Sequence, residues 1–188
     1  MADHRLKPIT PLGNSTPHSV TIGPVTISEV VDTALASLAT RMGEAKAVAD
    51  IADSAGIPLP GPGKAAQGAT YAAFWLSPDM WMIEAPFATH EDVIAQLKPH
   101  FGEAASLTEQ TDAWARFDVT GDDLPAMFER LCAFDLRSHG PGSATRTVIE
   151  HLGCYIVIRA PGHLSVLGPR SSAASLFHAL ETAAQSAF

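Results

Sequence analysis

Cysteine is scarce in this chain of 188 residues. Its two cysteines, Cys132 and Cys154, lie far apart in the sequence and form no Cys-x-x-Cys pair. A small disulfide scaffold uses many more cysteines, and a zinc site needs several clustered Cys or His ligands. None of the eight histidines lies three or four residues from another. The sequence therefore predicts neither a disulfide framework nor a metal site, and both cysteines are expected to be free thiols in a cytoplasmic protein.

Charged residues are also few, and positive ones fewest. Charged residues make up 17% of the chain, where a globular protein has about 25%. The 12 Lys and Arg stand against 20 Asp and Glu, which gives a formal net charge of −8. No basic stripe offsets this charge, so binding to nucleic acid or to an anionic membrane is not expected. Because 46% of the residues are hydrophobic, we expect a partner to cover part of the surface.

Long apolar runs and targeting signals are missing as well. No window reaches 18 uninterrupted apolar residues, as a membrane-spanning helix requires. The polar, proline-bearing stretch over residues 1–17 lacks the apolar core of a signal peptide. The sequence therefore predicts a soluble protein of the cytoplasm.

Motifs that carry catalysis or bind cofactors are absent too. Gly61-Pro62-Gly63-Lys64 only partly matches a phosphate-binding loop, because Pro58 replaces the first glycine and Ala65 the magnesium-binding hydroxyl. No Gly-x-Gly-x-x-Gly fingerprint and no Gly-x-Ser-x-Gly elbow occurs. The paired Asp122 and Asp123 precede a predicted helix, where carboxylates serve as caps. We expect no catalytic and no cofactor-binding residue in this chain.

The first 19 residues are expected to form an extended arm. Pro8, Pro11 and Pro17 exclude a stable helix there. The arm is either a loose terminus or a segment that lies across a partner, with Ile9 and Leu12 as its interface residues.

Residues 20–188 alternate strand and helix patterns joined by hairpin turns rather than by long crossovers. This order predicts an α+β fold of mostly antiparallel sheets with helices packed on one face. We expect one domain over 20–188, or two closely packed, similar halves over about 20–104 and 105–188. Strands are expected over 20–31, 70–76, 80–85, 105–110, 114–119, 145–149, 153–159 and 164–167. Helices are expected over 45–55, from Thr89 to Lys98, from 121 to 131 and from 172 onward. The stretch 34–42 fits either a strand or a helix.

Aromatic residues gather in one predicted hairpin. Trp75 and Trp81 lie in two strands joined by Ser77-Pro78-Asp79, which are residues typical of a tight turn. Such aromatics pack in a core, stack on a ligand or contact another subunit. Trp75 and Trp81 are therefore candidates for a subunit interface.

The same hairpin carries a resemblance to a known family. Its Trp-Leu-Ser-Pro-Asp-Met-Trp string over 75–81 resembles a segment of the gamma subunit of heterotetrameric sarcosine oxidase. Further segments that resemble the gamma subunit follow in the same order from about Thr70 to the end of the chain. They are 114–121, Leu131 to Leu136, Pro141-Gly142, Thr145-Arg146 and Arg170 to Leu176.

The resemblance implies the aminomethyltransferase fold of the glycine-cleavage T-protein and a place in a larger oxidase. It implies FAD, FMN, NAD and zinc in other subunits and tetrahydrofolate as a co-substrate. It also implies partnership with large alpha and beta subunits and a small delta subunit. The T-protein has an acidic residue where this chain has the uncharged stretch 153–158. Independent aminomethyl transfer is therefore not expected.

The leading hypothesis is a non-catalytic gamma subunit that stabilises a sarcosine oxidase. That enzyme converts sarcosine to glycine with hydrogen peroxide and formaldehyde or methylene-tetrahydrofolate. The alternatives are the equivalent subunit of N-methylglutamate dehydrogenase, a free-standing folate-binding or one-carbon transfer protein, and an interaction module unrelated to amine oxidation.

Overall fold

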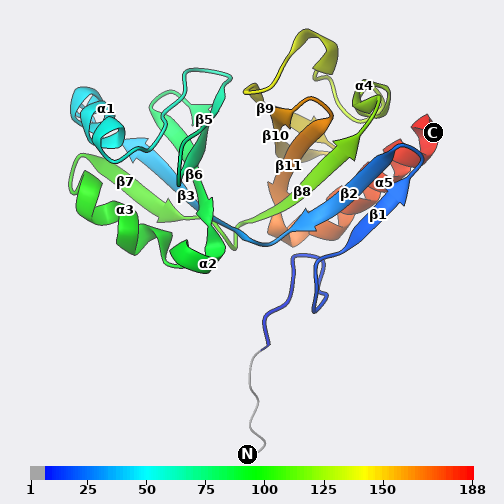
Figure 1. Cartoon of the computed structure of the whole chain (residues 1–188), viewed down its shortest axis with the longest axis horizontal. Coiled ribbons are helices and arrows are strands. Elements are labelled where there is room, and N and C mark those ends of the chain that lie inside the picture. The colour runs from blue at the N-terminus through cyan, green and yellow to red at the C-terminus, as the bar shows by residue number, and fades with distance from the viewer. Residues whose placement is uncertain (1–6) are drawn as a thin grey trace, which may run out of the picture.

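The computed structural model describes residues 7–188 and contains two antiparallel sheets that stand side by side (Figure 1). The six-stranded sheet has the order β1-β2-β8-β11-β10-β9. The five-stranded sheet has the order β4-β5-β6-β3-β7. This architecture confirms the α+β class that the alternation of strand and helix patterns predicted.

The strands of the six-stranded sheet are β1 (Ser19–Ile22), β2 (Val25–Val30), β8 (Trp114–Gly121), β9 (Ala144–Ile149), β10 (Leu152–Ala160) and β11 (His163–Pro169). Those of the five-stranded sheet are β3 (Thr33–Thr40), β4 (Ala65–Gln67), β5 (Ala72–Ser77), β6 (Met80–Pro86) and β7 (Ala105–Glu109). The ambiguous stretch 34–42 is thus a strand, and the expected strand over 20–31 is a hairpin that turns at Gly23, whose φ is +54°.

The chain crosses between the sheets twice. Strands β1 and β2 lie beside β8, where Ile27 pairs with Val119, and β7 lies beside β3. The strands are therefore not divided between the sheets at residue 105. Alternating apolar residues show that a strand is half-buried, but they do not specify which strand it joins.

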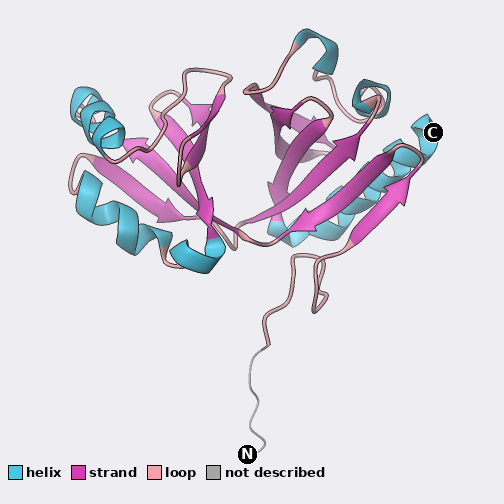
Figure 2. Ribbon diagram, viewed as in Figure 1, coloured by secondary structure: helices cyan, strands magenta, loops and turns pink. Residues whose placement is uncertain are grey.

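Helices cover the outer face of each sheet, and the inner faces meet (Figure 2). Helices α1 (Ala45–Ser54) and α3 (Val93–Phe101) pack on the five-stranded sheet, with the short α2 (Phe87–His90) nearby. Helices α4 (Leu124–Phe128) and α5 (Ala173–Ala187) pack on the six-stranded sheet. Two 3₁₀ turns span Leu136–Ser138 and Arg170–Ser172.

The helix expected from Thr89 to Lys98 begins and ends at other residues. Asp92 caps α3, because its carboxylate accepts a hydrogen bond from the Ala95 amide at 3.0 Å. Pro99 lies inside the helix, which continues to Phe101. Burial of Phe101 against the five-stranded sheet favours this last turn despite the proline.

The thiol of Cys154 is fully buried on β10, facing the core beneath α5. Burial raises the pKa of this thiol to about 11, so almost no reactive thiolate forms at neutral pH. Cys132 is partly exposed. We expect a thiol reagent at pH 8 to modify only Cys132 in the native protein, and both cysteines in urea. Rapid modification of both thiols without denaturant, measured by mass spectrometry, would contradict this.

Among the described helices, none combines the length and apolar character needed to cross a membrane.

Candidate functional site between the two sheets

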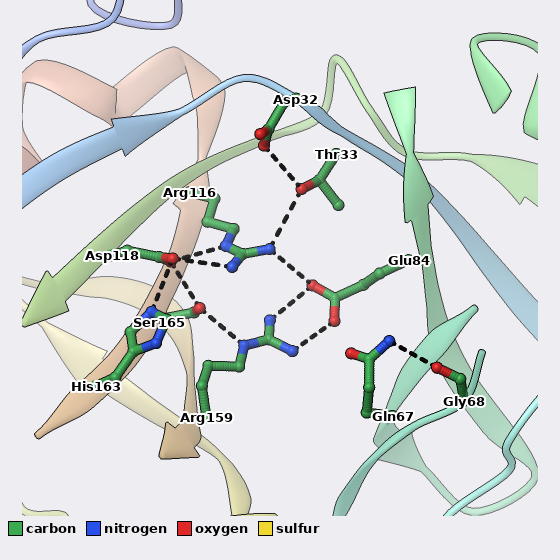
Figure 3. A network of polar contacts seen from close by, with 10 residues as sticks. All are labelled: Asp32, Thr33, Gln67, Gly68, Glu84, Arg116, Asp118, Arg159, His163 and Ser165. Atoms are coloured by element: carbon green, nitrogen blue, oxygen red, sulfur yellow. Dashed lines mark hydrogen bonds and ion pairs between the residues drawn. The ribbon is translucent and has the colours of Figure 1, made fainter. Parts of the chain in front are cut away.

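A network of charged side chains lies where the inner faces of the two sheets meet (Figure 3). Strand β8 alternates, so that Ala115, Phe117 and Val119 are buried in the core under α5, while Arg116 and Asp118 point to the other face. The network therefore occupies a space that two faces of opposite sheets create together.

Glu84 of β6 is the charged residue that the five-stranded sheet contributes to the network, and it is 3% exposed. Arg159 of β10 donates two hydrogen bonds to its carboxylate, each 2.7 Å long. The Arg116 guanidinium of β8 lies 3.5 Å from the same carboxylate. Paired, planar contacts of this kind are the strongest form of ion pair, so Glu84 joins the two sheets electrostatically.

Asp118 is the second carboxylate of the network. Arg116 donates to it through Nε and Nη2 at 2.8 and 3.0 Å, and Ser165 donates at 2.7 Å. His163 Nε2 lies 2.9 Å from its other oxygen. Burial alone would raise the pKa of Asp118, but Arg116, Ser165 and His163 together outweigh it and hold that pKa below its usual value. Asp118 is therefore an anion at neutral pH.

The two arginines also bond to hydroxyl groups. Arg116 Nη1 donates to the Thr33 hydroxyl at 3.3 Å, and Arg159 Nε donates to Ser165 at 2.9 Å. Burial would lower the pKa of Arg116, but Asp118 and Glu84 raise it overall. Each carboxylate already accepts bonds from arginine, so neither is free to take a proton from a substrate.

Apolar side chains surround the network and form much of the contact between the sheets. They include Trp114, which packs edge-to-face against Tyr155 with the two ring centroids 5.5 Å apart. Trp114 also donates from Nε1 to Gln110 at 3.1 Å. The buried members of this cluster are Leu35, Phe74, Met82, Ala144, Tyr155, Val157 and Leu167. These side chains pack the inner faces of the two sheets against each other.

Asp118 makes the stability of the protein depend on pH. Its pKa is lower in the folded than in the unfolded chain, so its contribution is present above the unfolded pKa and is lost as pH falls through the folded one. We expect Asp118→Asn to lower the free energy of unfolding by about 1–3 kcal/mol at pH 7. That difference should shrink below about pH 4, as urea titrations would measure. Asp50→Asn, in an exposed helix pair with Lys46, is the control, and a pH-independent difference for Asp118→Asn would contradict the assignment.

The four interface candidates from the sequence do not come together. Ile9 is 59% exposed, while Leu12 packs against the core of the six-stranded sheet. Trp75 and Trp81 are paired across the β5–β6 hairpin. Trp81 packs against the core of the five-stranded sheet, and its Nε1 donates a hydrogen bond to the Pro60 carbonyl at 2.8 Å.

The described part of the arm, residues 7–18, is held by two side chains. The buried carboxylate of Glu29 accepts bonds from the backbone amides of Leu12 and His18, at 2.9 and 3.0 Å. Arg170 donates to the Ile9 carbonyl at 3.1 Å. The arm therefore lies against the chain's own six-stranded sheet and below the junction of the sheets in Figure 1.

Sequence reasoning did not find Glu84, Arg116 and Arg159, and it left His163 unassigned. The available signal was weak but present. Glu84 interrupts an otherwise apolar strand, and Arg116 and Asp118 alternate with buried apolar residues. The expected capping role of Asp122 and Asp123 also differs from the structure. Asp123 precedes α4 with a φ of +52° and makes no side-chain cap bond.

Comparison with known proteins gives a fold but no family. No family model matches the chain, and no curated protein matches its sequence. A chain of the heterotetrameric sarcosine oxidase from Corynebacterium sp. U-96 superposes with a TM-score of 0.75 at 22% identity, covering 89% of this chain and 87% of that one. The glycine cleavage system aminomethyltransferase T from Bartonella henselae superposes with a TM-score of 0.65 at 13% identity.

The second superposition covers 85% of this chain but only 46% of the aminomethyltransferase. This chain thus spans about half the length of that enzyme and nearly all of the sarcosine oxidase chain. At these identities the likeness concerns the fold alone. The chain has an aminomethyltransferase-like α+β fold of the size found in the oxidase.

Proposed function

We propose that this chain is a small, non-catalytic subunit, equivalent to gamma, of a multi-subunit sarcosine oxidase. The observation that carries the proposal is the nearly complete, reciprocal coverage of a sarcosine oxidase chain. This chain covers only 46% of the compared aminomethyltransferase. That free-standing enzyme is therefore roughly twice as long as this chain.

The polar network supports a structural role. A site for tetrahydrofolate that moves a one-carbon unit needs a carboxylate free to accept a proton. Glu84 and Asp118 are instead engaged by arginines. Neither carboxylate is therefore free for this role, and we place folate chemistry in another subunit.

In this proposal the chain stabilises large alpha and beta subunits, together with a small delta subunit, in the cytoplasm. The other subunits carry FAD, FMN, NAD and zinc and oxidise the N-methyl group of sarcosine. This chain contributes contact surface and no reacting group.

Co-expression with the other three subunits tests the proposal. We expect this chain to co-elute with them on size exclusion in a complex that produces hydrogen peroxide from sarcosine. Omission of this chain should reduce the yield of assembled complex without changing the flavin content of the large subunits that remain soluble. A chain that stays monomeric and never co-purifies with the flavoproteins would overturn the proposal.

Two alternatives give different results in the same experiments. Assembly only with subunits that oxidise N-methylglutamate would assign the chain to that dehydrogenase. The fold it shares with an aminomethyltransferase favours a test of folate as well. Micromolar binding of tetrahydrofolate by the isolated chain, measured by calorimetry, would favour a free-standing folate-binding protein.

A further inference from the structure

A hollow of about 660 Å³ lies at the junction of the two sheets, beneath the N-terminal arm. Arm residues 8–11 form part of its wall, and the strand ends that cross between the sheets form its floor. A second hollow of about 560 Å³ shares Ile9, Thr10, Pro11, Asp112 and Arg170 with the first. The arm thus stands as a wall between two depressions.

The lining of the first hollow includes exposed apolar side chains. Ile9 and Val31 line it and are 59% and 41% exposed. They are two of only five large hydrophobic side chains exposed in residues 7–188. Phe87 and Trp114 extend the same apolar lining. Exposed apolar side chains concentrated in one depression are typical of a contact surface.

The rim of this hollow is acidic. Glu91, Glu109 and Asp112 are exposed around it. Within residues 7–188, Asp112 pairs with Arg170, whereas Glu91 and Glu109 form no ion pair. The hollow therefore offers negative charge beside apolar surface.

The two arginines that line the hollow are already paired with the chain's own carboxylates. Arg116 is engaged by Asp118, Thr33 and Glu84. Arg170 is engaged by Asp112 and by the Ile9 carbonyl. What the hollow can still offer is apolar contact and attraction for a positive charge.

We infer that this hollow is the docking site for a segment of a partner subunit that presents an apolar side chain next to Lys or Arg. The inference rests on the proposed function and names the surface that the assembly uses. The apolar side chain would lie against Val31 and Ile9, and the cation would lie near Glu91 and Glu109. Electrostatic complementarity of this kind sets partner choice and speeds association.

The test measures binding of this chain and its variants to the remaining co-purified subunits by biolayer interferometry. Val31→Asp should weaken binding at least tenfold, because it places a charge in the apolar contact. The matched control is Val148→Asp, since Val148 is 60% exposed on β9, at the opposite edge of the six-stranded sheet from β1. It should change binding less than twofold.

A second set of variants reverses the charge at the rim of the hollow. The double change Glu91→Lys and Glu109→Lys should weaken binding about tenfold and reduce the loss of affinity between 50 and 500 mM salt. The control is Glu44→Lys, at the exposed position before α1. The circular dichroism spectrum of each variant should match that of the wild-type chain, which checks that the variant is folded.

The outcomes separate this inference from the proposed function. If the wild-type chain binds and all variants bind equally, the docking site is wrong and the subunit role stands. If the wild-type chain does not bind at all, the proposed function fails. Tighter binding by a chain that begins at Lys7 would assign the hollow to residues 1–6. Self-association abolished by Val31→Asp would assign it to a second copy. Either result overturns the inference.

Discussion

Replacement of Glu84 by glutamine is expected to lower the free energy of unfolding by about 3–5 kcal/mol, because it leaves buried positive charge without its anion. Glu84 is 3% exposed and holds Arg159 in two bonds of 2.7 Å, with Arg116 at 3.5 Å. The glutamine has the same shape, so the loss reflects charge rather than packing. Because Glu84 is the charged residue that the five-stranded sheet contributes to the network, the contact between the sheets should weaken most.

Urea titration at pH 7, followed by circular dichroism, measures this change. The matched control is Glu103→Gln, whose side chain is 89% exposed and pairs with Arg41. It should cost less than about 1 kcal/mol. A double-mutant cycle with Glu84→Met and Arg159→Met should recover part of the loss, since apolar side chains replace a buried pair well. An effect of Glu84→Gln no larger than that of the control would show that the pair does not stabilise the fold.

Alanine at Gly121 is expected to cost about 3 kcal/mol or more and to reduce soluble expression. Gly121 ends β8 with a φ of +139° and pairs with Val25 of β2. An added Cβ would lie 2.1 Å from the Pro24 carbonyl oxygen and 2.9 Å from the Val25 Cα. These are backbone atoms, so no change of rotamer relieves the contact. The substitution should separate β2 from β8.

Two other glycines serve as controls that separate the cost of the backbone conformation from the cost of the steric clash. Gly43 has a φ of +86° with no atom near its added Cβ, so Gly43→Ala should cost only the left-handed backbone penalty of about 1–2 kcal/mol. Gly140 has neither feature, and Gly140→Ala should stay within about 0.5 kcal/mol. Urea titrations should therefore rank the losses as Gly121, then Gly43, then Gly140. Equal losses at Gly121 and Gly43 would exclude the proposed clash.

Several local features were predictable because neighbouring residues decide them. The helix expected over 45–55 is α1 (Ala45–Ser54). The hairpin expected around Ser77-Pro78-Asp79 is β5 and β6, and Asp79 has the φ of +58° that such a turn uses. Each depends on short-range patterns: apolar periodicity, a glycine stop or a turn residue.

The partners of the strands were not predictable in the same way. Strand β2 joins β8 across about half of the chain, and β7 joins β3. Alternation in β2 fits any half-buried strand, so only the packing of both cores selects its neighbour. The site has the same origin, since Glu84, Arg116 and Arg159 become neighbours only when the two sheets meet.

The sequence by itself determined the α+β class, the positions of most elements and an acidic, charge-poor composition, because these follow from local pattern and residue counts. Only the tertiary structure decided which strands share a sheet, the ionic contact between the sheets and the acidic hollow beside Val31. The physical reason is that long-range pairing and charge burial depend on residues that the chain separates and only folding brings together.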